Sequence, residues 1–202
     1  MELCDVKFAC LDTETTGLSP DGGGKVCEIA VSISCGGRVL EEFSTLINPD
    51  MPMHPDVIAI HGITNEMVKD APLFKEVLPR LKELFDGCVL VAHNADFDIG
   101  FLKSEFEQCG EKFPDYPVID TLKLARKSGL FERNRLGHIA EQLGLSNSGW
   151  HRAMADTKMG EEVLYYFLTL LCKSGHTTLE DLSACQRTKW KDLGINCKEM
   201  KV

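Results

Sequence analysis

The stretch VKFACLDTE, residues 6–14, carries the clearest indication of the fold. It starts as an apolar run, Val6–Leu11, and ends with two acids, Asp12 and Glu14. A short apolar run without polar alternation is typical of a strand buried on both faces of a sheet. Successive side chains of a strand alternate between faces, so the two carboxylates lie on the same face, about 7 Å apart. The stretch therefore predicts a central strand that ends in a pair of acids.

The segments that follow this strand predict an α/β fold. Residues 26–34 and 38–47 flank Cys35-Gly36-Gly37 and are typical of a β-hairpin. Two short apolar strands are expected further along, at residues 88–92 and 118–119. The helical segments that we expect are residues 74–85, 95–109, 121–127, 134–143 and 153–171. A hairpin followed by alternating strands and helices indicates a mixed sheet covered by helices.

The length of the chain fits one domain with a short extension. A chain of 202 residues buries about 70% of the surface that it exposes when unfolded, so it needs no disulfide or structural metal to fold. We expect one domain over residues 1–172 and an appendage or tail over residues 173–202, where little core pattern is found. This tail is slightly basic, with Trp190 between Lys189 and Lys191. A weakly packed end is the favoured interpretation, and docking of a partner or of the substrate strand is the alternative.

The composition indicates a soluble, cytoplasmic protein. The first ten residues lack the basic start and the long apolar run of a signal peptide. The longest apolar run, Val163–Cys172, is about half as long as a membrane span requires. The nine cysteines form no C-x-x-C pair and no zinc-type cluster, so we expect buried thiols in a reducing compartment. The net charge of −9 is unusual for a nucleic-acid enzyme, but an acidic body is compatible with that function if divalent cations meet the phosphate.

Two further acids lie where a helix is expected to face the core. Asp98 is followed by Phe101 and Leu102, at i+3 and i+4, which makes its carboxylate part of an apolar stripe. Asp156 begins a similar stripe with Met159 on the last long helix. An uncompensated buried charge is very costly, so both acids need a specific partner.

Three explanations apply to these four acids. The first is that each reaches solvent or pairs with a basic residue, and Arg152 is the basic residue at helical spacing from Asp156. The second is a general acid–base pair of the glycosidase kind, which uses only two carboxylates. The third is a shared metal site, since two carboxylates 4 Å apart repel by about 4 kcal/mol at an effective dielectric of 20. Oxygen ligands favour Mg²⁺ or Mn²⁺, and the metal explanation accounts for all four acids.

Several segments resemble the exonuclease motifs of the DEDDh superfamily of 3′–5′ exonucleases. The resemblance covers roughly residues 5–170 in the expected order. It is nearest to the proofreading exonucleases of bacterial DNA polymerase III, both the separate epsilon subunit and the domain within large replicative polymerases. In the second motif the acid after Phe is the ligand, which selects Asp98 over Asp96. The matching segments are DTETTGL (12–18), HNADFDIGFL (93–102), HRAMAD (151–156), HGIT (61–64) and VIDT (118–121).

The resemblance implies a ribonuclease H-like fold with a mixed five-stranded sheet, and an active site that binds two Mg²⁺ or Mn²⁺ ions. Asp12 is expected to bridge the two ions. Glu14 and Asp156 complete the ion that carries the attacking water, and Asp98 serves the ion on the leaving-group side. His151 is expected to take the proton from that water, and its ordinary pKa near 6.5 suits this role.

The resemblance also places the 3′ terminus of the substrate at the loop after the first strand. Thr15 is expected to contact it through its backbone, while Leu18 and Phe97 pack against the terminal bases. Such stacking is indifferent to base sequence. His61 is a further candidate for substrate binding, and core packing is the alternative for Phe97. His93 follows an apolar strand, and we expect it to make a structural hydrogen bond.

The function implied is a metal-dependent 3′–5′ exonuclease that releases nucleoside monophosphates from DNA in proofreading or repair. Its substrate would be the 3′ end of a single or frayed strand, and a DNA polymerase subunit is a further expected partner. The five catalytic residues do not distinguish the two sugars, so an exoribonuclease that trims RNA ends or short oligoribonucleotides remains an alternative. A polymerase-binding accessory module is the alternative from another class, and the complete set of catalytic residues argues against it.

Overall fold

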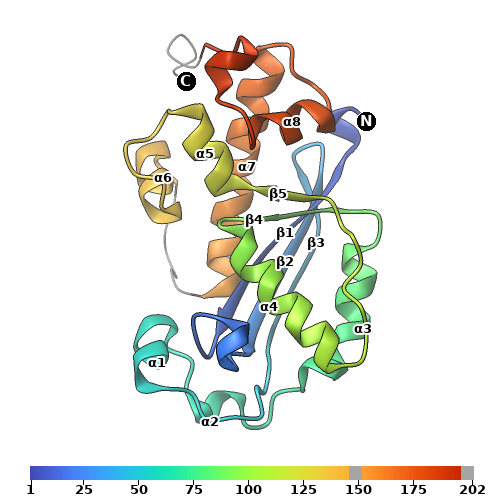
Figure 1. The fold of residues 1–202 in the computed structure, drawn as a ribbon, viewed down its shortest axis with the longest axis vertical. Coiled ribbons are helices and arrows are strands. Elements are labelled where there is room, and N and C mark those ends of the chain that lie inside the picture. The colour runs from blue at the N-terminus through green and yellow to red at the C-terminus, as the bar shows by residue number, and fades with distance from the viewer. Residues whose placement is uncertain (146–151, 197–202) are drawn as a thin grey trace.

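The computed structural model describes residues 1–145 and 152–196 and contains one five-stranded sheet with the strand order β3-β2-β1-β4-β5 (Figure 1). β1 pairs antiparallel with β2 and parallel with β4, while β3 and β5 extend the sheet on either side. The sheet is therefore mixed, as the sequence predicts. The strands are β1 (Lys7–Thr15), β2 (Val26–Cys35), β3 (Arg38–Leu46), β4 (Val89–Ala92) and β5 (Val118–Asp120).

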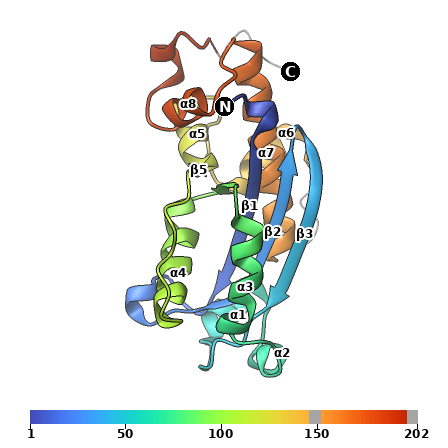
Figure 2. The same cartoon turned by 90° about the vertical axis from the view of Figure 1, so that its right-hand side faces the viewer.

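Helices cover both faces of the sheet, and β1 shows which residues point to which face. Ala9 and Leu11 pack into a core with α3 and α4, whereas Phe8 and Cys10 pack into a second core with α5, α6 and α7. Figure 2 shows α4 and α7 on opposite sides of the sheet. The helices are α1 (Pro55–His61), α2 (Asn65–Val68), α3 (Phe74–Phe85), α4 (Ala95–Gln108), α5 (Thr121–Ser128), α6 (Leu136–Leu143), α7 (Ala153–Lys173) and α8 (Leu179–Cys185), with short 3₁₀ helices η1 (Leu3–Asp5), η2 (Pro20–Gly22) and η3 (Trp190–Leu193).

This arrangement confirms the predicted α/β class and the central position of the first strand. The alternation along β1 places Asp12 and Glu14 on the face covered by α7, and it places Thr13 on the face covered by α4. Of the helices in the described ranges, none has the length and apolarity needed to cross a membrane.

The C-terminal segment differs from the weakly packed end that we favoured. Trp190 is fully buried, donates a hydrogen bond from Nε1 to the carbonyl oxygen of Cys185 at 3.1 Å, and lies 5.6 Å from the ring of Phe167. Ile195 is also buried in the same core. These apolar residues follow no helical or strand period, so periodicity does not reveal them. The described part of residues 173–196 is packed, and its separation as an appendage beyond residue 172 stays a prediction.

The same segment is bonded to the beginning of the chain. The amide of Leu3 donates to the carbonyl oxygen of Thr177 at 2.7 Å, and the amide of Leu179 donates to that of Met1 at 3.0 Å. The two described ends of the chain are thereby joined beside the α7 core.

Candidate active site

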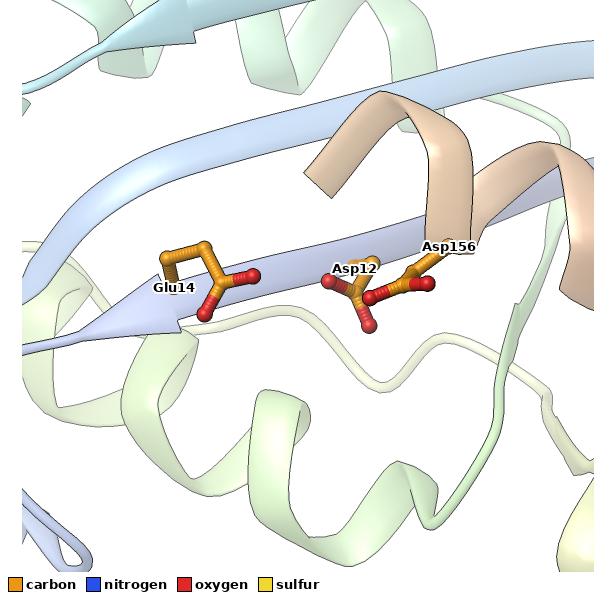
Figure 3. Close-up of side chains that lie close together, drawn as sticks. All are labelled: Asp12, Glu14 and Asp156. Atoms are coloured by element: carbon orange, nitrogen blue, oxygen red, sulfur yellow. The ribbon is translucent and has the colours of Figure 1, made fainter. Parts of the chain in front are cut away.

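Three of the predicted acids meet between β1 and α7. Asp12 and Glu14 come from β1, and Asp156 comes from the first turn of α7 (Figure 3). One carboxylate oxygen of each lies within 4.8 Å of the corresponding oxygens of the other two. The pair spaced two residues apart on the strand therefore receives its third member from a segment more than a hundred residues away in the sequence.

The fourth acid, Asp98, approaches from the opposite side of the sheet. It lies on α4, is 3% exposed, and accepts two hydrogen bonds at Oδ1 from Thr13, one from the amide at 3.0 Å and one from the hydroxyl at 2.7 Å. Asp98 is not part of the group of three, although its charge acts on Asp12 more strongly than that of any other acid. Thr13, which stands between the two acids of β1, was not expected to take part. Strand alternation places Thr13 on the face that α4 covers, but it does not identify Asp98 as its partner.

The electrostatics of the site are dominated by burial and by repulsion among the acids. Burial raises the pKa of Asp12 well above its ordinary value, and Asp98, Glu14 and Asp156 raise it further. Burial, followed by Asp156, raises the pKa of Glu14 to about 8. Burial also raises the pKa of Asp98 to about 7, against the opposing effect of the hydrogen bonds from Thr13. At neutral pH this cluster requires either protons or an external cation.

The donor atoms of the cluster fit a divalent cation of the magnesium type. Within the described residues the group of three offers only carboxylate oxygens, without thiolate or imidazole. Hard cations such as Mg²⁺ and Mn²⁺ take oxygen ligands, whereas zinc sites usually include nitrogen or sulfur. The site therefore has the chemistry that the sequence predicts for a metal centre.

A second buried acid next to the cluster has its own partner. Glu28 on β2 is 3% exposed and lies directly opposite Glu14 in the strand register. It accepts hydrogen bonds from Arg152, the shortest from Nη2 at 2.7 Å, and from the amide of Ala153 at 3.0 Å. Arg152, which we considered as a partner of Asp156, thus pairs with Glu28. Glu28 was missed although it is a single acid within an apolar strand, which is the same signal that identifies Asp12.

The predicted substrate-binding residues differ in accessibility. Leu18 is 85% exposed, and Phe97 is partly buried with its ring 4.9 Å from that of Phe101. Thr15 is buried and donates a hydrogen bond to the carbonyl oxygen of Gly17 at 2.7 Å. His61 is 5% exposed, and its Nδ1 accepts a hydrogen bond from the Ile63 amide at 3.0 Å. The predicted base, His151, lies outside the described residues.

His93 has the structural role that was predicted for it. Its Nδ1 lies 2.9 Å from the hydroxyl oxygen of Thr121, and its Nε2 lies 2.9 Å from the carbonyl oxygen of Asn134. These two bonds connect the end of β4 to α5 and to the segment before α6. Burial lowers the pKa of His93, which favours a neutral ring in this network.

Comparisons with known sequences agree with this geometry. Residues 9–164 match the family described as Exonuclease (RNase_T). The 3′-5′ exonuclease DinG of Bacillus subtilis is 35% identical over 177 residues, which is 87% of this chain and 19% of that protein. A DNA polymerase III subunit epsilon-like protein of Rhodobacter capsulatus is 42% identical over 176 residues, or 85% of this chain and 25% of that protein. The chain thus spans less than a third of the length of these curated relatives.

Solved structures extend the comparison to the fold. Exonuclease X in complex with 5′ overhanging duplex DNA is 27% identical, with a TM-score of 0.69 over 90% of this chain and 99% of that chain. E. coli exonuclease I in complex with a dT13 oligonucleotide has a TM-score of 0.76 over 89% of this chain and 46% of that chain. Its identity of 19% supports the fold alone. The predicted ribonuclease H-like fold and the resemblance to the DEDDh exonucleases are confirmed, and the chain belongs to the exonuclease family.

Proposed function

We propose that this domain is a metal-dependent 3′–5′ exonuclease that releases nucleoside monophosphates from the 3′ end of DNA. The observation that carries the proposal is the group of three carboxylates within 4.8 Å of one another, with a fourth buried acid beside it. Family membership alone leaves the direction of cleavage and the nature of the strand open. A cluster of acids can hold the divalent ions that promote phosphodiester hydrolysis.

The acids of the cluster would hold two divalent ions, Mg²⁺ or Mn²⁺. Asp12 has neighbours on both sides, because Glu14 and Asp156 share its face of β1 and Asp98 acts on it from α4. It is therefore the residue best placed to serve both ions. When bound, two such ions stabilise the attacking and the leaving oxygen of an in-line phosphoryl displacement.

The remaining steps belong to side chains of the chain itself. His151 would accept the proton of the attacking water, since its ordinary pKa lies near neutrality. Leu18, which is 85% exposed beside the end of β1, would pack against a terminal base, and Phe97 would support the same base. Thr15 would hold the 3′ terminus through its backbone, with His61 as a further contact.

DNA is the proposed substrate because the related proteins are named for DNA enzymes. They include a DNA polymerase III epsilon-like protein and DNA polymerases III of the PolC type. The solved structure of exonuclease X is a complex with DNA. These names describe those proteins, and they support the same substrate class for this domain.

Digestion of strands labelled at the 3′ or the 5′ end tests the proposal. DNA and RNA of the same sequence are incubated with Mg²⁺, Mn²⁺ or EDTA, using the native protein, His151→Ala, and His176→Ala as a matched histidine control. We expect a metal-dependent ladder that shortens DNA from its 3′ end, is lost in His151→Ala and is kept in the control. Cleavage of RNA in preference to DNA would overturn the choice of substrate. A folded protein that cleaves neither strand with either metal would overturn the proposed activity.

A further inference from the structure

A cavity of about 550 Å³ opens directly onto the acidic cluster. Asp12 and Asp156 form one end of its lining, while Arg126 from α5 and Arg135 before α6 form another part. Both arginines are exposed, and neither makes an ion pair within the described ranges. The two guanidinium groups therefore line the same cavity as the two carboxylates.

A second cavity, of about 650 Å³, adjoins the first through a shared residue. Arg126 lines both, and Lys127, Lys189 and Lys191 line the second. The second cavity lies between the end of α5 and the segment around η3. The two cavities together connect the acidic cluster to the C-terminal segment.

Apart from Asp12 and Asp156, the charged residues that line the two cavities are positive. No acid is among the described residues that line the second cavity. In a chain with a net charge of −9, a cavity lining with four cations and no acid is a local exception, although the exposed Asp192 directly follows Lys191. We refer to these residues as the basic track: Arg135, Arg126, Lys127, Lys189 and Lys191.

The C-terminal end of the basic track is held in place by a buried anchor. Trp190 stands between Lys189 and Lys191 and is fully buried against Phe167, while both lysines are exposed. The hydrogen bond from its indole to Cys185 fixes the ring further. The flanking lysines are therefore presented on a rigid turn, which reduces the entropy that a bound partner must remove.

We propose that the basic track binds the sugar-phosphate backbone of the single strand whose 3′ end lies in the acidic cluster. The inference rests on the proposed function, because it takes the direction of the strand from the site of cleavage. Arginine pairs with phosphate through two parallel hydrogen bonds, and lysine contributes a point charge. A strand that reaches only the cluster gains none of the distal contacts, whereas a longer strand gains those of Lys189 and Lys191.

The test measures binding separately from cleavage. Fluorescence anisotropy in EDTA gives the Kd of labelled single strands of about 20 nucleotides, longer than the site size of about 4–16 nucleotides typical of one single-strand-binding domain. DNA and RNA of the same sequence form the two arms, at several salt concentrations. The variant Lys189→Gln/Lys191→Gln is compared with the native protein and with Lys103→Gln/Lys112→Gln. This control removes the same charge from two exposed lysines that line neither cavity.

A plot of the logarithm of the association constant against the logarithm of the salt concentration has a negative slope. Loss of two phosphate contacts should make this slope shallower by roughly 1.4, since each contact to a single strand contributes about 0.7. The same relation gives an increase in Kd of roughly 20-fold at 0.1 M salt. With Mg²⁺ present, the KM for the long strand should rise by a similar factor while kcat stays close to that of the native protein. The control should match the native protein, and the loss should appear with both DNA and RNA, because the proposed contacts are to phosphate.

The outcomes separate the basic track from the proposed activity. An unchanged Kd and salt slope in Lys189→Gln/Lys191→Gln would overturn the track, even if the protein cleaves DNA. An equal loss in the control variant would overturn it as well, because the effect would then follow from net charge alone. The protein could bind the strand through Lys189 and Lys191 and yet cleave neither DNA nor RNA. That result would support strand binding by the basic track and count against the proposed exonuclease activity.

Discussion

Glu14 and Glu28 lie opposite each other on β1 and β2, yet the two carboxylates have different charged neighbours. Glu28 is neutralised within the fold by Arg152 at 2.7 Å and by the amide at the start of α7. Glu14 shares its space with Asp12 and Asp156, and its pKa is raised to about 8. Arg152 lowers that pKa, but burial and the neighbouring acids outweigh it.

The difference separates a buried charge that the fold itself compensates from one that we propose to be functional. The fold neutralises Glu28 with an arginine of its own. We propose that the adjacent cluster is neutralised by a cation from solution. Buried acids that repel one another destabilise the metal-free protein, and natural proteins accept such local costs at functional sites. The following variants and conditions test whether the two carboxylates differ in this way.

The largest effect is expected from Asp12→Asn. This change removes the carboxylate placed to serve both ions, so the cleavage rate should fall on the order of a thousandfold, or about 4 kcal/mol. The same change removes one of the mutually repelling charges, so the melting temperature in EDTA should be equal to or above that of the native protein. Steady-state cleavage and thermal melts measure the two quantities. A variant that loses activity together with several degrees of stability would indicate a structural role for Asp12 instead.

A smaller effect on the free energy of unfolding is expected from Arg152→Met. It leaves Glu28, whose side chain is 4% exposed, as a buried charge without its cation, at a cost of about 3 kcal/mol. Glu28→Gln should cost only about 1 kcal/mol, because Arg152 is half-exposed and remains solvated. Denaturant unfolding of both variants and of their double variant gives the coupling between the two groups.

Lys158→Met is the matched control for this pair. Lys158 is as exposed as Arg152, but its partner Glu42 is 39% exposed rather than buried. Its removal should cost about 0.5 kcal/mol or less. Equal costs for Arg152→Met and Lys158→Met would show that burial of Glu28 does not matter.

A further effect is expected from pH in the absence of metal. Glu14 and Asp98 have folded-state pKa values raised from 4.5 to about 8 and from 3.8 to about 7. Groups of this kind stabilise the fold fully below their unfolded pKa, and this contribution is lost as the pH rises through the folded pKa. The melting temperature in EDTA should therefore fall as the pH rises from about 5 to about 8.

Divalent metal should reduce that fall, because a bound cation takes over the compensation that protons provide at lower pH. Differential scanning calorimetry with EDTA or with Mg²⁺ over the same pH range makes the comparison. Parallel curves in the two conditions would show that the cluster does not bind the metal.

The sequence predicts the acids of the cluster better than it predicts the residues that hold these acids in place. Asp12, Glu14 and Asp156 each stand out as acids in apolar surroundings, and the structure brings them together. The interaction of Thr13 with Asp98 could not be derived from periodicity, which indicates the faces of each element but not which faces meet.

Other parts of the structure depend on contacts without a sequence period. The pairing of Glu28 with Arg152 joins residues 124 positions apart, and nothing in either local pattern identifies the partner. The packing of Trp190 against Phe167 is of the same kind. Such contacts are decided by the whole fold, since each buried polar or aromatic group takes whichever partner the assembled elements bring near.

The joining of Leu3 to Thr177 and of Leu179 to Met1 has a mechanical consequence. When the chain is pulled from Met1 and from residue 196, the packing of Trp190 and the hydrogen bonds of Leu3 and Leu179 carry the tension first. These contacts therefore protect β1 and α7 from force that is applied at the two ends of the described chain. Single-molecule extension should show release of the C-terminal segment as a separate early event, with the sheet and the acids of the cluster still in register.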